Sequence, residues 1–443
     1  VAYFQGAQAG QSPMLFDQYM YGKANLTGAV APWFNPWGED RGEFFNKPLT
    51  AKGLATVSPG YNGARYCLRQ ALDELYTNTW KQMRKDDGSE YYSASEFFKD
   101  FDRDGDNLID NIQLVYTCPP QPKDENGHAI DNELFWAFRT VSSYKIGSNC
   151  PGANNFLWLS YETFFENGHY VNGRYADWTN DEKLKGVAKL DAHTLIHETG
   201  HAMGAEDYYT EASGDSPAAG AFLMMADNVG DHDPWSKTFY GWTNPTVVLN
   251  DCEITLDKFQ TNGDCLLIPC KGAWTYDGAT NSIIDEFIMV EYWSPDGLNE
   301  FDCKNRYQGN SFYPQGPDAE GIKLWHVDAR LGSYVRNKDG EYKFRRYETS
   351  LIHIDDGYVY LAHKNDKDDQ KKYGCNNFKL LETMRKDLQA AKPGQYFSED
   401  NLWFTGESFN GIDFKMHNEM KFGFNIKVNS IENGKASLSI TTK

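Results

Sequence analysis

The sequence predicts an α+β protein in two parts, a mixed helix-and-strand part followed by a β-rich part. The chain has 443 residues, whereas one domain typically holds roughly 100–200. Apolar residues make up 40% and aromatic residues 15%, which is enough to fill real cores and argues against general disorder. Short β-rich segments separated by turn residues dominate after about residue 245. We therefore expect one domain at 1–245 and a second at 246–443.

The first part mixes the periodicities of helices and strands. Apolar residues near helical spacing or in short runs predict helices at 62–83 and 191–204 and buried strands at 112–116 (IQLVY) and 156–162 (FLWLSYE). In the second helix, Asp191 is placed to cap the N-terminus and Gly204 to end the helix.

The second part is a series of strands. Its β-rich segments are CEITL, CLLIPC, EFIMVEYW, GIKLWHV, GYVYLAH, FGFNIKV and KASLSITT. This pattern predicts a β-sandwich-like domain.

Charge and hydropathy exclude two classes of partner. The formal net charge of −20 would repel a phosphate backbone, so nucleic acid is a poor partner. No apolar run approaches the roughly 20 residues of a membrane helix. The chain opens VAYFQG, without Met or a basic segment, so no signal peptide is recognised. A processed or trimmed start would explain the missing signal peptide, so its absence does not argue for the cytosol.

Eight cysteines bear on compartment and metal chemistry. None forms a CxxC pair, so a thiolate zinc site is not expected. A Cys118–Cys150 disulfide, or one from Cys252 to Cys265 or Cys270, would suit an exported protein. The alternative is that most are free buried thiols.

The central motif is His197-Glu198-Thr199-Gly200-His201. Residues i and i+4 share one face of a helix, so both imidazoles can bind one ion. Glu198 then lies beside the open coordination position, where it can take a proton from zinc-bound water and pass it to a leaving amine. The motif predicts a catalytic zinc site with Glu198 as general base and then acid.

Asp207 extends the motif to H-E-x-x-H-x-x-G-x-x-D. Gly204 can adopt a positive φ and end the helix sharply, so that the chain turns back. Asp207 is thereby predicted as the third zinc ligand, because an aspartate oxygen is an acceptable zinc donor. The alternative role for Asp207 is to accept a hydrogen bond from a ligand histidine.

Two methionines follow the motif by about 20 positions, in FLMMADNVGDHDPWSKTFYGW. In metzincins a Met in a tight turn forms an apolar floor under the metal and is not a ligand. Met225 is predicted for that role, with Met224 as the alternative.

The segments HETGHAMGAEDYY and LMMADNVGDHDPWSKTFYGW together resemble the M6 (immune inhibitor A-like) peptidases. FKDFDRDGDNLIDNIQLVY, DEFIMVEYWSPDGLNEFD and GIKLWHVD are weaker likenesses, and the resemblance covers about residues 60–335. It implies a metzincin-like zincin fold and an extracellular, zinc-dependent endopeptidase made with an inhibitory pro-segment. The sequence departs from the family at Ala205-Glu206-Asp207, where Leu-Pro-Asp is commoner, and no pro-segment is visible.

Residues 102–110 have the spacing of a calcium loop. The predicted ligands are the carboxylates of Asp102, Asp104, Asp106 and Asp110 and the carbonyl of Leu108. Asn107, at the position usually held by Gly, tolerates a left-handed conformation. Gln113 stands where an EF-hand has a bidentate Glu, so this is not a full EF-hand. The expected role is to stiffen the domain, and a solvated acidic turn is the alternative.

A group that stabilises the oxyanion is expected near the zinc. His232 is the first candidate for this catalytic role; the others are Tyr208, Tyr209 and Tyr240. His193 lies one turn before His197, where helix capping or packing is expected. His326, among apolar strand residues, is expected to be a satisfied core histidine.

The sequence therefore predicts a secreted or cell-surface zinc endopeptidase, monomeric and without a transmembrane segment, which cleaves protein or glycoprotein substrates. Two alternatives stand beside it. One is a surface binding or adhesin module with a structural metal site, although such a site would need no Glu198. The other is a zinc hydrolase of non-peptide amides.

Overall fold

The computed structural model describes about three-fifths of the chain. Its described residues are 28–32, 61–116, 137–160, 163, 170–171, 174–175, 192–205, 207–209, 217–272, 285–304, 306, 313–329, 332–336, 342–346, 379–389 and 391–442. Within them, the contacts divide the chain into two compact units between Met203 and Gly204. The domain boundary expected at 245/246 stays a prediction. The architecture is a mixed α+β one with several sheets.

The first unit is built on a three-stranded sheet. Its strands run in the order β1 (Ile112–Tyr116), β3 (Asn155–Ser160) and β2 (Phe138–Val141), with β3 parallel to β1 and antiparallel to β2. The predicted strand at 112–116 is confirmed at both ends, and the one at 156–162 is confirmed through Ser160. Every residue of β3 is buried, as expected for a central strand covered on both faces.

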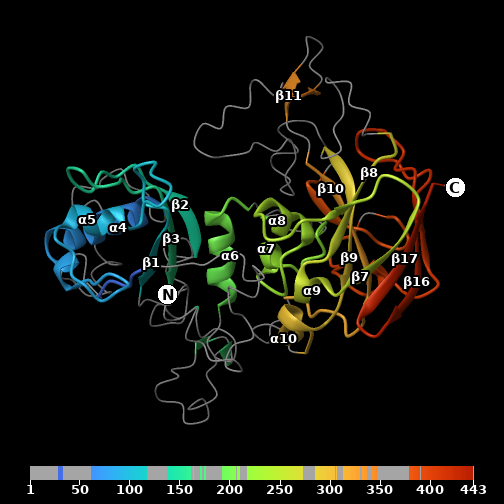
Figure 1. Cartoon of the computed structure of the whole chain (residues 1–443), viewed down its shortest axis with the longest axis horizontal. Helices are drawn as coiled ribbons and strands as arrows, with labels where there is room; N and C mark the ends of the chain where they lie inside the picture. The colour runs from blue at the N-terminus through green and yellow to red at the C-terminus, as the bar shows by residue number, and fades with distance from the viewer. Residues whose placement is uncertain are drawn as a thin grey trace. The chain divides into compact units, whose positions relative to one another are not determined.

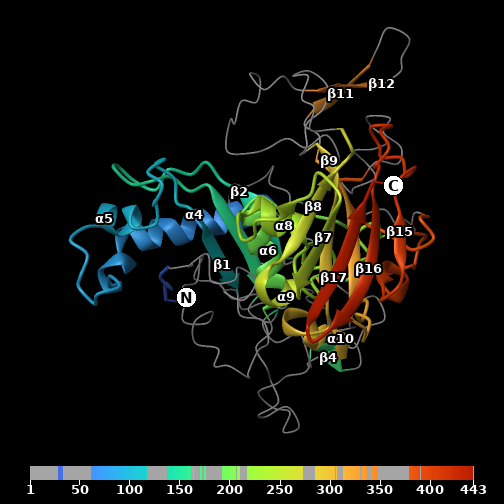
Figure 2. The same ribbon diagram turned by 45° about the vertical axis from the view of Figure 1, so that its right-hand side comes forward.

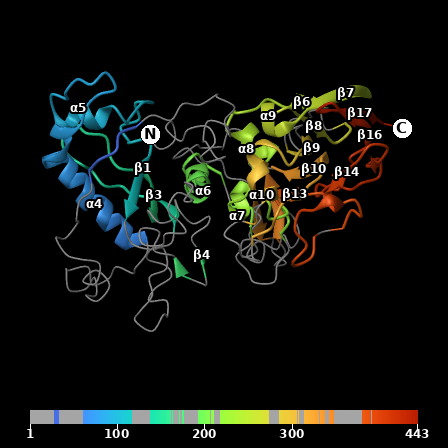
Figure 3. The same cartoon turned by 90° about the horizontal axis from the view of Figure 1, so that it is seen from below.

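Alternation along β3 assigns its side chains to two cores. Phe156 and Trp158 belong to a core that also includes Leu68 and Leu72. That core lies against α4 (Tyr61–Thr77), which runs beside the sheet (Figure 3). The rest of the predicted helix at 62–83 is a short 3-10 turn, Thr79–Gln82, and α5 (Ala94–Lys99) follows it.

The other face of β3 carries helix α6 (His193–Ala202), which lies beside β2 and β3 (Figure 1). Leu157 and Leu159 form a small buried cluster with Leu195 of the helix. Because one face of α6 packs on the sheet, the opposite face of the helix points away from it.

Two sheets dominate the second unit. The first has the order β13–β10–β9–β8–β6, with β14 also paired to β10. Its strands are β6 (Thr246–Val247), β8 (Cys265–Pro269), β9 (Glu286–Trp293), β10 (Gly321–Asp328), β13 (Leu381–Thr383) and β14 (Leu402–Trp403). The second is entirely antiparallel in the order β15–β16–β17–β7, and β7, β17 and β16 lie side by side in Figure 2. Its strands are β7 (Cys252–Asp257), β15 (Ser408–Asn410), β16 (Asn425–Glu432) and β17 (Lys435–Thr441).

The two sheets share one hydrophobic core. Ile288 and Leu324 of the six-stranded sheet and Ile426 and Leu438 of the four-stranded sheet all belong to it. The strands predicted in this half are confirmed, except that FGFNIKV is a strand only from Asn425 and GYVYLAH lies outside the described residues.

The opposite face of the six-stranded sheet packs on a different segment. The alternate residues Met289 and Trp325 share a core with Tyr208 and Met225. The helices of this unit are short: α7 (Met224–Asp227), α8 (Pro234–Phe239), α9 (Phe259–Asn262), α10 (Glu300–Lys304) and the 3-10 turns Gly297–Asn299 and Glu399–Asn401. Two-stranded pairs complete the described elements: β4 (Tyr170–Val171) with β5 (Arg174–Tyr175) in the first unit, and β11 (Gly332–Arg336) with β12 (Tyr342–Arg346) in the second.

The structure corrects the expected disulfides. Cys150, Cys252, Cys265 and Cys270 are free thiols, as are the described Cys67 and Cys303, while Cys118 lies outside the described residues. Cys265 faces the core that contains Tyr208, whereas Cys252 and Cys270 face the core shared by the two sheets, so the two cores separate Cys252 from Cys265. Among the described cysteines the alternative, free thiols, is confirmed. None of the described helices is long and apolar enough to cross a membrane.

Candidate metal centre

Helix α6 presents the two histidines of the motif on one face. His197 is buried and His201 is half-buried. Their Nε2 atoms lie 3.1 Å apart and their rings are nearly perpendicular, at 89°. Two ligands of a tetrahedral zinc ion with Zn–N near 2.0–2.1 Å would be separated by about 3.3 Å. The pair therefore fits one ion as the spacing predicts.

The ends of α6 are defined by the chain around them. Gly204 has φ +101°, a left-handed value that favours glycine, so the predicted stop is confirmed. At the C-terminus, the Asn155 side-chain amide donates a 2.9 Å hydrogen bond to the carbonyl of Ala202. At the N-terminus the capping residue is Ala192, without a side-chain cap, and Asp191 lies outside the described residues.

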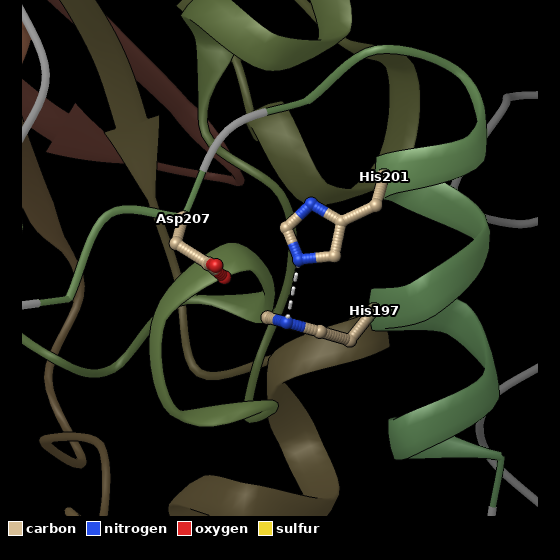
Figure 4. A group of neighbouring side chains, drawn as sticks. All are labelled: His197, His201 and Asp207. Atoms are coloured by element: carbon tan, nitrogen blue, oxygen red, sulfur yellow. Dashed lines mark hydrogen bonds between the residues drawn. The ribbon is translucent and has the colours of Figure 1, made fainter. Parts of the chain in front are cut away.

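Asp207 joins the two histidines after the turn at Gly204. One ligand atom from each of His197, His201 and Asp207 lies within 4.8 Å of the other two. Both imidazole rings extend from α6 toward the Asp207 carboxylate (Figure 4). Two imidazole nitrogens and a carboxylate oxygen are donors that zinc accepts. The donor set thus fits the predicted ion, and in the part of the chain that the structure describes no fourth His, Cys, Asp or Glu joins this group.

Glu198 follows the first histidine on α6 and is buried, with 6% of its surface exposed. It is not one of the three grouped residues. His193, at the start of the helix, is also buried and outside the group, in keeping with the packing role expected for it. Glu198 is thus a buried carboxylate next to two candidate ligands, and its catalytic role stays a prediction.

Met225 is in contact with the segment that carries Asp207. The Tyr208 backbone N–H donates a 2.8 Å hydrogen bond to the carbonyl of Met225. Met225 is fully buried and shares a core with Tyr208, whereas Met224 is buried outside that core. Met225 is thus bonded to the segment that carries Asp207, and its role as the apolar floor stays a prediction.

The segment after Met225 is held by buried charges. Lys237 Nζ and Asp231 Oδ2 are 2.7 Å apart, with 0% and 3% of the side chains exposed. Burial raises the pKa of Asp231 and lowers that of Lys237, and their attraction opposes both shifts. Asp233 caps α8 by accepting from the Ser236 backbone N–H, and Tyr208 Oη lies 2.9 Å from Ser236 Oγ. These buried contacts tie Tyr208 to α8.

His232 is deeply buried in the second unit. Its ring packs edge-on against Tyr240 and Trp242, and 1% of its surface is exposed. Burial raises the pKa of Tyr240 well above its ordinary value, so its phenol stays protonated. His232 is not part of the metal-capable group, and its oxyanion role stays a prediction.

The predicted calcium loop gathers three of its carboxylates. One oxygen each from Asp102, Asp104 and Asp110 lies within 4.8 Å of the others. Asp106 is not part of this group, and its Oδ1 accepts a 2.7 Å hydrogen bond from the Leu108 backbone N–H. The expected carbonyl ligand, Leu108, lies in the same loop.

The loop backbone has the expected shape. Asn107 has φ +67°, the left-handed conformation that its position predicts. Its backbone N–H donates to Asp102 Oδ2 at 3.1 Å, and the N–H of Gly105 donates to Asp102 Oδ1 at 3.0 Å. Gly152, near β3, donates its N–H to the Asn107 carbonyl, which attaches the loop to the sheet.

Sequence reasoning missed the supporting contacts. Asn155, the Asp231–Lys237 pair and the Tyr208–Met225 hydrogen bond carry no motif that would single them out. The one available signal was the acidic residue six positions before a lysine in DHDPWSK.

Comparison with protein-family models finds no match for this chain, and comparison with curated proteins finds none either. The resemblance to the M6 peptidases therefore stays an expectation from the motif.

Proposed function

We propose that the chain is a zinc-dependent endopeptidase with a metzincin-like zincin domain and a β-sandwich-like domain, akin to the M6 peptidases. The observation that carries the proposal is the grouping of His197, His201 and Asp207. Three protein ligands are typical of catalytic zinc, whereas structural zinc sites are usually closed by four. The core shared by two sheets supports the β-sandwich-like part.

His197, His201 and Asp207 would hold the ion. Zinc bound there supplies a Lewis acid that polarises a carbonyl and lowers the pKa of water to about 7. Glu198 takes the proton of the attacking water and delivers it to the leaving amine nitrogen. Burial of the Glu198 side chain keeps bulk water from competing for that proton.

Two further proposals attach to the same function. The Asp102–Asp110 loop would bind calcium and stiffen the sheet on which α6 packs. The protein would act outside the cell on protein or glycoprotein substrates as a monomer. All described cysteines are free thiols, so the resemblance, and no disulfide among them, supports the proposal of export.

The test is the Glu198→Gln variant. We expect it to bind one zinc ion at the motif as the parent does, and to lose cleavage of casein by a factor of about 10²–10⁴, because a general base contributes that much. The matched control is Glu300→Gln, an exposed carboxylate that should leave both properties unchanged.

Cleavage of casein at the parental rate by Glu198→Gln would refute the mechanism. A parent protein that binds zinc but cleaves no peptide in a broad library would indicate the binding module instead. Mass spectrometry of products would reveal a non-peptide amide substrate.

A further inference from the structure

A second group of metal-ligand side chains lies in the β-rich unit, apart from the motif. Glu286 is the first residue of β9, His326 lies in β10, and His417 comes from the segment between β15 and β16. One ligand atom from each lies within 4.8 Å of the others. Glu286 and His326 are buried and His417 is half-buried.

Strand register explains why these residues meet. Asp328 pairs with Glu286 across β10 and β9, and His326 pairs with Glu382 across β10 and β13. His326 and Asp328 are two positions apart, so they share one face of the sheet. Four ionisable side chains therefore converge at one end of the six-stranded sheet.

His417 packs against the face of the sheet that carries His326 and Asp328. Its Nδ1 lies 2.9 Å from Asp328 Oδ2 and its Nε2 lies 3.4 Å from Glu382 Oε2. Its ring centroid is 4.3 Å from that of His326. The backbone N–H groups of His417 and Asn418 donate to the two oxygens of Glu286, at 2.5 and 2.8 Å. The segment is thus fixed on the cluster by both side chain and backbone.

The cluster carries excess negative charge in a buried place. Glu286 and Asp328 are 1% and 0% exposed, and like charges directly opposite one another destabilise a sheet. With Glu382, three carboxylates face two imidazoles, and buried charges need a counter-charge to be tolerated. A divalent cation supplies as much positive charge as two protonated imidazoles, and it leaves both imidazoles neutral, as ligands must be.

The donor types select the kind of ion. Calcium and magnesium prefer all-oxygen sites, whereas imidazole nitrogens suit zinc and other first-row transition ions. His326 Nε2 lies 2.7 Å from Glu286 Oε1, and the other ring nitrogen of His326 is 3.5 Å from Glu382. A carboxylate that holds the second nitrogen of a ligand histidine is the usual support of a metal site.

We propose that Glu286, His326 and His417 bind a second divalent transition-metal ion, with zinc as its natural occupant, and that Asp328 orients His417. The ion joins the segment around His417 to the strands β9 and β10. Its role is structural, since it fastens the connection between β15 and β16 to the six-stranded sheet, and it is independent of the peptidase proposal.

The experiment counts zinc on the purified full-length chain after chelation, reconstitution with zinc and removal of the excess. Mass spectrometry of the metal should give two zinc ions per chain for the parent. The His197→Gln/His201→Gln variant should keep one, and so should His326→Gln/His417→Gln. Combining the four substitutions should leave none, and His193→Gln, a buried histidine outside both groups, should keep two.

A further measurement leaves the proposed ligands of the second site unchanged. In the His197→Gln/His201→Gln background, Asp328→Asn should weaken zinc binding by roughly 10–100-fold, as loss of a carboxylate behind a ligand histidine does. Absence of zinc from the His197→Gln/His201→Gln protein, with its fold intact by circular dichroism, would overturn the proposal. It would show that protonated histidines alone balance the carboxylates.

Discussion

The backbone N–H of Tyr208 donates a 2.8 Å hydrogen bond to the carbonyl of Met225. This bond attaches Tyr208, which follows the candidate zinc ligand Asp207, to the segment that contains Met225. Both residues are buried in the core under the six-stranded sheet. The position of Asp207 therefore depends on packing in the β-rich unit as well as on the turn at Gly204.

Truncation of Met225 tests this dependence. Met225→Ala should lower the free energy of unfolding by about 2–5 kcal/mol, because it leaves a cavity. Met225→Leu nearly conserves volume and should cost less than about 1.5 kcal/mol. Urea denaturation of the zinc-free proteins gives both values. Equal losses of unfolding free energy in the two variants would mean that the core closes around the alanine and leaves no cavity.

Substitution of Asp207 distinguishes a ligand from an orienting acceptor. As a ligand, Asp207→Ala should reduce zinc affinity by more than the roughly 10–100-fold expected when only a partner of a ligand histidine is lost. Competition with a chromophoric chelator measures the affinity. Asp400→Asn, an exposed carboxylate, should bind zinc as the parent does. A loss below tenfold would remove Asp207 from the ligand set.

The Lys237–Asp231 pair should contribute strongly to stability only while it is complete. Lys237→Met leaves Asp231 buried without its cation, and the expected loss is about 3–5 kcal/mol. Lys435→Met breaks an exposed pair with Asp257 and should cost only about 0–1 kcal/mol. Denaturant titrations compare the two, and a similar loss for both variants would contradict the role of burial.

Glu291 should make stability depend on pH. Burial raises its pKa from 4.5 to about 7, against the opposing effect of Lys323. The folded state then holds a proton that the unfolded state releases, so the contribution is fully present below pH 4.5 and lost as pH rises through about 7.

The measurement compares the parent with Glu291→Gln between pH 4.5 and 7.5. The parent should lose stability relative to the variant as pH rises across this range. If the difference between the two proteins stays constant with pH, the raised pKa is wrong.

Calcium should stabilise the first unit through the 102–110 loop. At a calcium concentration 100 times the dissociation constant, the expected gain is about 2.7 kcal/mol. Asp104→Asn should abolish the rise in melting temperature on calcium addition. Asp106→Asn should reduce it less, because Asp106 lies outside the grouped carboxylates. A larger effect of Asp106→Asn would favour the ligand set expected from sequence spacing alone.

The sequence alone determined the features that depend on neighbours along the chain. The four-residue spacing of His197 and His201 fixes a shared helix face, Gly204 ends that helix, and Asn107 takes the left-handed turn of its loop. A short apolar run also predicted the strand 112–116, and a β-rich segment between turn residues predicted the strand 286–293. Each follows from local backbone geometry, whose repeat is visible in the residue order.

Only the tertiary structure decided which distant segments meet. Nothing in the order of residues brings His417 to Glu286, since strand register and a covering segment do so. The same holds for Tyr208 with Met225 and for Asn155 at the end of α6. Such contacts depend on the packing of whole sheets and on burial of charge, which have no period in the sequence.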